Sequence, residues 1–286
     1  MLKPVQYKQN TTVNQDRNYS PNIWSDCPYL EILEGKRNGI IFDDDLLDFV
    51  VAATQTTAVT QGRYTAYCAT AGTWHADNMP TSATAAVAGA GGGISGLCDT
   101  DGDAMAIGTY ASPFILTTTM TGKLWFEARI ATTSILTNMG QLFLGLCENR
   151  IAAYSATVPL GNADTANTTN AMIGFNRKED GLGVLNTMYA DHSATITYVQ
   201  ESANTTLAAN TWIKLGMKFD PTDSARCVRF YVDNVECSSA ITKAVLLATT
   251  FVDVSGLGPC LAFYADSAGT ADYVYLNRWR CVQTFE

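Results

Sequence analysis

The densest group of metal-type ligands in the sequence is an acidic run near position 100. Asp99, Asp101 and Asp103 stand at alternate positions, and Gly102 allows a sharp turn between them. Carboxylate oxygens at this spacing are the hard ligands that Ca²⁺ prefers, so they form a candidate calcium site. An EF-hand loop also needs a bidentate glutamate downstream, whereas Ala104 begins a stretch of apolar and small residues. A solvated turn, with no bound metal or other cofactor, is therefore the favoured interpretation, and calcium is the alternative.

Groups that could carry catalysis are sparse. Glycoside hydrolysis needs two carboxyl groups in one cleft, and Glu127 is the acid that we would test first. The two histidines, His75 and His192, have no metal-binding spacing, and Gly93-Ile94-Ser95-Gly96 lacks the GxSxG pattern of a nucleophilic serine. We therefore predict from the sequence that the protein is not an enzyme and has no catalytic residue.

Tryptophans supply a second kind of candidate site. Trp125 and Trp212 stand on or beside predicted strands, where an exposed indole could stack on a sugar ring. Packing in a core or an interface is the commoner role for such residues. A glycan site lined by Trp125 and Trp212 is therefore kept as an alternative hypothesis.

Composition and charge narrow the classes of partner. The chain has 286 residues and a formal net charge of −9, and its Lys and Arg residues form no cluster along the sequence. We therefore predict that it binds neither nucleic acid nor anionic membranes. Only 16% of the residues are charged, and a surface rich in small polar residues suits contacts inside an assembly. The eight dispersed cysteines are predicted to be mostly reduced core residues.

The elements that must position these residues are predicted to be short β-strands. Asp180-Gly181 and Asp233-Asn234 are typical of tight hairpin turns. No convincing long amphipathic helix interrupts the strands, so the pattern predicts an all-β, antiparallel β-sandwich. In the hairpin 212–236, six residues are expected to face outward: Lys214, Gly216, Lys218, Arg229, Tyr231 and Asp233. Apolar residues alternate with others over 124–130, 142–146, 173–175, 213–219 and 228–232, and further strands are expected at 196–199, 261–264 and 273–279.

The first 40 residues differ from the rest of the chain. They are polar and without periodicity, with isolated aromatic residues such as Tyr19, Trp24 and Tyr29. Such a segment stays mobile unless it is anchored. We therefore predict an extended N-terminal arm over residues 1–40, anchored on a neighbouring chain or on its own domain, and a sandwich domain over residues 41–286.

Several of these strands, taken in order, resemble a known family. The sequence resembles the concanavalin A-like/laminin G-like jelly rolls, and more narrowly the version found in structural proteins of tailed-phage virions. The resemblance covers about residues 98–284 and implies a jelly-roll fold. The ExDxxE strand of the hydrolases that share this fold is not recognisable here. The segments that carry the resemblance are GKLWFEARI (122–130), QLFLGLCEN (141–149), NTWIKLGMKFD (210–220), VRFYVDN (228–234) and a last segment over 258–283.

The resemblance implies a role in a virion. We predict a capsid decoration or cement protein that binds the major capsid protein and neighbouring copies of itself and stabilises the outer shell. It is expected on the capsid surface, after synthesis in the host cytoplasm, as a homo-oligomer for which a trimer is one arrangement. The alternative hypothesis is a carbohydrate- or receptor-binding module of a phage fibre or tail.

Overall fold

The described residues form two antiparallel β-sheets packed face to face, with three short helices beside them. This confirms the predicted all-β, antiparallel β-sandwich. The structure is a computed structural model, and it describes residues 19–44, 46, 59–61, 63–69, 73–76, 94–98, 104–117, 119, 122–133, 141–148, 171–178, 183–191, 196–200, 206–248, 251, 256–264 and 272–285.

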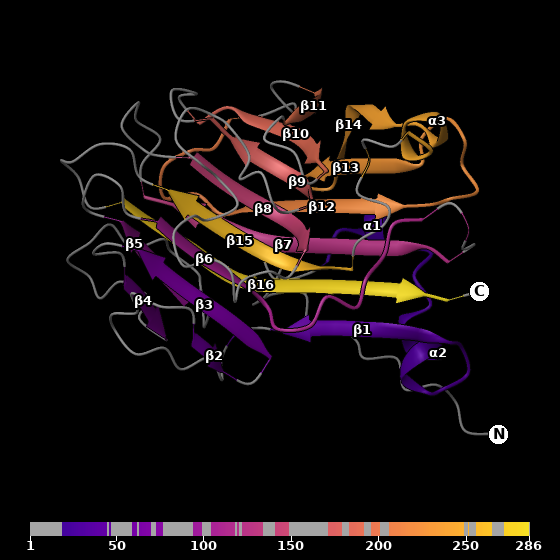
Figure 1. The fold of residues 1–286 in the computed structure, drawn as a ribbon, viewed down its shortest axis with the longest axis horizontal. Helices are drawn as coiled ribbons and strands as arrows, with labels where there is room; N and C mark the ends of the chain where they lie inside the picture. The colour runs from indigo at the N-terminus through magenta and orange to yellow at the C-terminus, as the bar shows by residue number, and fades with distance from the viewer. Residues whose placement is uncertain are drawn as a thin grey trace.

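Sheet A has eight strands among the described residues and includes the first and last of the described strands. Its order is β14-β13-β12-β7-β16, and beyond β16 it continues both as β5-β4 and as β1. In Figure 1, β12, β7, β16 and β1 run nearly horizontally. The strands are β1 (Gly39–Asp44), β4 (Thr73–Ala76), β5 (Ile94–Cys98), β7 (Leu124–Thr132), β12 (Ile213–Phe219), β13 (Val228–Val232), β14 (Val235–Ile241) and β16 (Asp272–Thr284).

Sheet B also has eight strands, in the order β11-β10-β9-β8-β15-β6-β3-β2. In Figure 1, β8, β9 and β10 cross the strands of sheet A diagonally. The strands are β2 (Val59–Gln61), β3 (Tyr64–Ala69), β6 (Ala104–Thr109), β8 (Gln141–Glu148), β9 (Met172–Arg177), β10 (Leu185–Ala190), β11 (Thr197–Gln200) and β15 (Leu257–Tyr264).

The core lies between the sheets and follows the predicted alternation. In β7, Leu124, Phe126, Ala128 and Ile130 all belong to the main apolar cluster. Trp279 of β16 is fully buried there, and its indole nitrogen donates to the Tyr64 hydroxyl of sheet B over 3.3 Å. Because side chains alternate across a strand, Trp125, Glu127 and Arg129 stand on the outer face of sheet A.

The hairpin between β13 and β14 is the tight turn that the sequence predicts. Asp233 and Asn234 have φ values of 45° and 69°, and Val232 pairs directly with Val235. Positive φ at both central residues matches the twist of the flanking strands, and Asp and Asn tolerate it better than most residues. The predicted outward orientation in β12 and β13 holds as well, since Leu215, Met217 and Phe230 face the core.

The described part of the predicted N-terminal arm docks on the chain's own domain, one of the two anchors considered from the sequence. This part forms α1 (Pro21–Trp24) and α2 (Tyr29–Leu33), and it lies on the chain's own sheet A, with α1 against β7 and β12. The reason is apolar burial, because Ile23 packs with Trp125 and Tyr231 on the outer face of the sheet. We call residues 19–33 the N-terminal segment. Residues 1–18 lie outside the described residues. The third helix is α3 (Lys243–Leu246).

Candidate functional site

Glu127 is a buried carboxyl group at the centre of the outer face of sheet A. Its side chain lies in β7, with 5% of the residue surface exposed. The Ser20 backbone N–H donates to Oε2 over 2.9 Å, and the Trp24 indole N–H donates to the same oxygen over 3.3 Å. Burial raises the pKa of Glu127, and the Ser20 hydrogen bond, the Lys214 charge and the Trp24 hydrogen bond offset only part of this effect. Glu127 therefore holds its proton to higher pH than an exposed glutamate.

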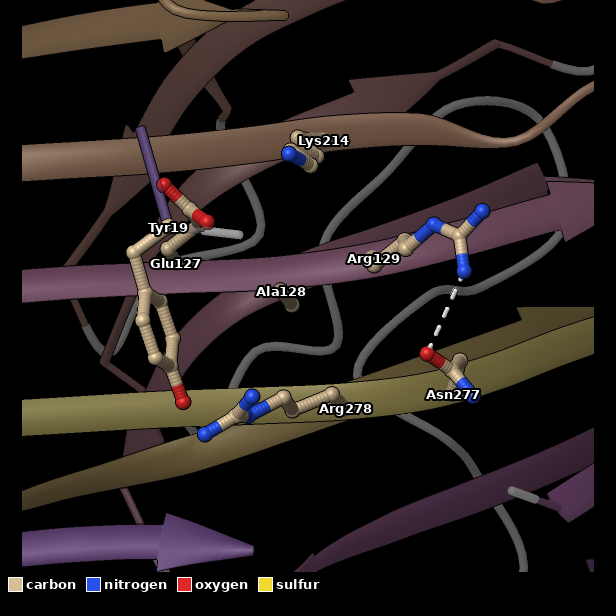
Figure 2. Close-up of a pocket in the computed structure, with 7 residues that line it drawn as sticks. All are labelled: Tyr19, Glu127, Ala128, Arg129, Lys214, Asn277 and Arg278. Atoms are coloured by element: carbon tan, nitrogen blue, oxygen red, sulfur yellow. Dashed lines mark hydrogen bonds between the residues drawn. The ribbon is translucent and has the colours of Figure 1, made fainter. Parts of the chain in front are cut away.

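A pocket opens beside Glu127 on the same face. Figure 2 shows its polar side chains arranged around Ala128. Arg129 donates to the Asn277 Oδ1 atom over 3.4 Å, and its guanidinium carbon lies 4.5 Å from the centre of the Trp212 ring. The pocket therefore combines an acid, several cations, an amide and a phenol. Its lining residues come from four segments of the chain: Tyr19, Glu127, Ala128, Arg129, Lys214, Asn277 and Arg278.

An irregularity in β16 brings two of these residues to the pocket. Leu276 pairs with Ile130 and Arg278 pairs with Arg129, so Asn277 is an extra residue in the register. Such a β-bulge turns neighbouring side chains toward the same face of a sheet. Asn277 and Arg278 consequently both line the pocket, although adjacent residues of a regular strand would point to opposite faces.

A row of aromatic residues continues the outer face beyond the pocket. Trp212 and Tyr273 are half-buried, and Tyr275 lies between them in the same apolar cluster. The Trp212 and Tyr275 ring centres are 6.3 Å apart, and the Tyr273 and Tyr275 rings stack at 6.0 Å. A ligand that extended from the pocket along the sheet would therefore meet aromatic surface.

Asp43 of β1 links the N-terminal segment to the edge of the pocket through hydrogen bonds and ion pairs. It accepts hydrogen bonds from the Tyr19 and Tyr29 hydroxyls over 2.8 and 3.1 Å, and it forms ion pairs with Arg278 and Arg280. Burial pushes the pKa of Asp43 upward, but the hydrogen bond and charge of Arg280 and the charge of Arg278 outweigh it and lower the pKa. The Tyr19 ring is held over these two guanidinium groups, at 4.1 Å from Arg278 and 3.4 Å from Arg280.

The sequence-predicted site residues have different outcomes. Trp125 is only 1% exposed and donates to Asp26 over 3.0 Å beneath the N-terminal segment, so it does not line a solvent-facing groove as the glycan hypothesis required. Trp212 stands beside the pocket. The predicted calcium ligands, Asp99, Asp101 and Asp103, lie outside the described residues.

Other residues of the site were not predicted from the sequence. The sequence shows no basic cluster, yet the fold gathers Arg129, Lys214 and Arg278 from three different strands around one pocket. Alternation along β7 placed Arg129 on the same face as Glu127, but the bulge at Asn277 has no recognisable signal in the sequence. Tyr19 was noted only as an isolated aromatic residue.

Other classes of site find no counterpart in the described part of the chain. Among its residues, no three His, Cys, Asp or Glu side chains gather in a way that could hold a metal ion. The six cysteines described there are free thiols. No helix in the same residues is long and apolar enough to cross a membrane.

Comparisons with known proteins agree on the fold. No family model and no curated protein matches the sequence. A solved structure of a protein of unknown function from Shewanella oneidensis aligns over 90% of this chain and 94% of its own, with a TM-score of 0.52 and 12% identity. At this identity the likeness shows the fold alone.

Two further solved structures that resemble the chain are enzymes. An endo-1,3-beta-glucanase from Streptomyces sioyaensis aligns over 87% of this chain and 98% of its own, with a TM-score of 0.48 and 14% identity. A carbohydrate esterase from the Shiga toxin-encoding bacteriophage phi24B aligns over 82% of this chain and 100% of its own, with a TM-score of 0.43 and 14% identity. By name, these two structures are carbohydrate-active proteins, and one of the two comes from a phage.

These neighbours correct one prediction. From the sequence we predicted that the protein is not an enzyme, and the neighbouring sandwiches, which are mostly those of enzymes, contradict that prediction. The neighbours give no support to capsid decoration.

Proposed function

We propose that the protein binds carbohydrate on the outer face of sheet A, in the pocket beside Glu127. The observation that carries the proposal is that the charged pocket and the aromatic row adjoin each other on one face of sheet A. Charged and amide side chains line the pocket, and Arg129 connects them to the aromatic row by stacking on Trp212.

Sugars need both kinds of surface. Their C–H faces pack against aromatic rings, and their hydroxyl groups exchange hydrogen bonds with planar polar groups such as guanidinium, amide and carboxyl. Ligand sites of this kind combine apolar surface with a few polar groups that fix orientation. Arg129 and Asn277 are held in place by their mutual hydrogen bond, so little ordering is required when a ligand binds.

The experiment is a glycan array with the full-length protein, followed by calorimetry on the best ligand. We expect Trp212→Ala to weaken binding by at least about tenfold, because it removes stacking surface and the partner that holds Arg129. Tyr110→Ala is the matched control, since Tyr110 is an exposed aromatic residue at the end of β6 in sheet B. Equal binding by the Trp212 variant and the wild type would refute the proposed site.

The pKa of Glu127 favours a second candidate function at the same site, a carbohydrate-active enzyme. Burial raises the pKa of Glu127, and a carboxyl group with a raised pKa is suited to act as a general acid. The Ser20 and Trp24 N–H groups both donate to Oε2, and Glu127 lines the pocket where a ligand would bind. Wild-type activity on a polysaccharide panel should be lost in Glu127→Gln, and unchanged activity in that variant would exclude Glu127 as the acid.

A further inference from the structure

The side chains around the pocket are mostly cationic, whereas the whole chain carries a net negative charge. The protein carries a formal net charge of −9, yet three cationic side chains line the pocket, with one carboxyl group among them. Arg280 lies behind Tyr19 and adds a fourth cation. Two further carboxylates lie nearby: Asp43 forms ion pairs with both Arg278 and Arg280, and Asp233 accepts a hydrogen bond from the Lys214 backbone N–H.

The geometry of Arg129 suits a planar anion. Its guanidinium stacks on the Trp212 ring and donates to the Asn277 amide oxygen, and both contacts help to orient it. A fixed guanidinium presents parallel N–H donors that match the two oxygens of a carboxylate. Lys214 approaches the same pocket from β12 and supplies a second positive charge. Burial raises the pKa of Glu127, so protonating this carboxyl group beside a bound anion costs less than protonating an exposed glutamate.

We infer that this pocket selects acidic sugars, and that the carboxylate of a uronic acid residue binds between Arg129 and Lys214. This inference rests on the proposed carbohydrate-binding function and names its ligand class. In this arrangement the sugar carboxylate pairs with the cations, and the chain of sugars continues over Trp212 and the tyrosines of β16. Neutral sugars would gain the stacking but would lose the charge-assisted hydrogen bonds.

The test compares uronate tetrasaccharides with their carboxyl-reduced counterparts, which have the same linkages and no charge. The panel covers mannuronate, guluronate, galacturonate and glucuronate, and binding to the full-length protein is measured by calorimetry at low and high salt. We expect at least one acidic tetrasaccharide to bind about tenfold tighter than its reduced form at low salt. The advantage should shrink as salt screens the charges.

Two variants locate the effect. Lys214→Gln should cut the preference for the acidic form to less than about threefold. Lys178→Gln is the control, because it makes the same change in net charge on sheet B, where Lys178 lies over the Tyr198 ring. This variant should keep the full preference for the acidic form. An equal loss in both variants would overturn the inference, because the preference would then come from overall charge.

The outcomes also separate the inference from the proposed function. If an acidic tetrasaccharide and its reduced form bind equally well, selection by charge is wrong and carbohydrate binding stands. If no tetrasaccharide binds and the glycan array is also negative, both fail together.

Discussion

Glu127 and Asp43 are two carboxyl groups on one sheet that the fold shifts in opposite directions. Glu127 is surrounded by neutral donors from the N-terminal segment, so burial dominates and its pKa rises. Asp43 faces two arginines that outweigh its burial, so its pKa falls. Opposite shifts on neighbouring acids are typical of functional sites, and they predict opposite dependences of stability on pH.

Replacing Glu127 with Gln should stabilise the protein increasingly as the pH rises. A raised pKa in the folded state means that folding stability is lost as the pH rises from the ordinary value of 4.5 toward the folded pKa. Gln keeps an acceptor for Ser20 and Trp24 without a charge to bury. In urea unfolding across pH 4 to 8, the free energy of unfolding of the variant should therefore increase relative to that of the wild type as the pH rises. A constant difference would show that the pKa of Glu127 is unshifted.

Replacing Asp43 with Asn should have the reverse dependence. The stability that Asp43 contributes is present above its unfolded pKa of about 3.8 and is lost as the pH falls through its lower folded value. At pH 7 the variant should lose about 2 kcal/mol in its free energy of unfolding, because Arg278 and Arg280 are left with an uncharged partner. The deficit should vanish at strongly acidic pH. A loss that is equally large below pH 3 would contradict the ion-pair explanation.

At the scale of elements, close packing decides which substitutions each sheet tolerates. A Cβ atom on Gly145 of β8 would lie 2.2 Å from the Ile173 carbonyl oxygen, which is rigid backbone of β9. A Cβ on Gly216 of β12 would lie 2.2 Å from Cδ1 of Ile23, the end of a flexible side chain in the N-terminal segment, and 3.0 Å from the Phe126 carbonyl oxygen. The two glycines thus meet very different obstacles.

Gly145→Ala should therefore cost more stability than Gly216→Ala. We expect a loss of about 3 kcal/mol or more at Gly145, where two strands must separate, and about 1 kcal/mol at Gly216, where a side chain turns aside. Thermal unfolding of the two variants measures the difference. Gly216→Ala should also shift the emission of Trp125 toward longer wavelength, because Ile23 helps to cover it. Equal losses at the two sites would contradict the assigned contacts.

Elements were easier to predict than the site, for physical reasons. The alternation of β7 and the Asp233-Asn234 turn depend on local sequence, and both were predicted correctly. The docking of the N-terminal segment depends on Ile23 finding apolar surface on distant strands, which no local pattern records. The bulge at Asn277 and the gathering of cations likewise appear only when the strands are paired.

At the scale of the whole molecule, the sandwich presents two outer faces of different character. On sheet B, the side chains that point away from the main core are buried, and they include the apolar Ala106, Phe143 and Ala262 as well as the amides Asn176 and Asn186. The outer face of sheet A carries the N-terminal segment at one end, the charged pocket in the middle and the aromatic row beyond it. Attachment to a capsid and self-association rest on the sequence resemblance alone and stay predictions, as does the virion location.

The location of the bound glycan is the most direct test of carbohydrate binding on sheet A. We propose a crystal structure of the full-length protein with the strongest ligand from the glycan array. A sugar ring is expected in the pocket between Arg129, Lys214 and Arg278, with further rings extending over Trp212. A ligand bound on the outer face of sheet B, with the sheet A pocket empty, would contradict the proposed site.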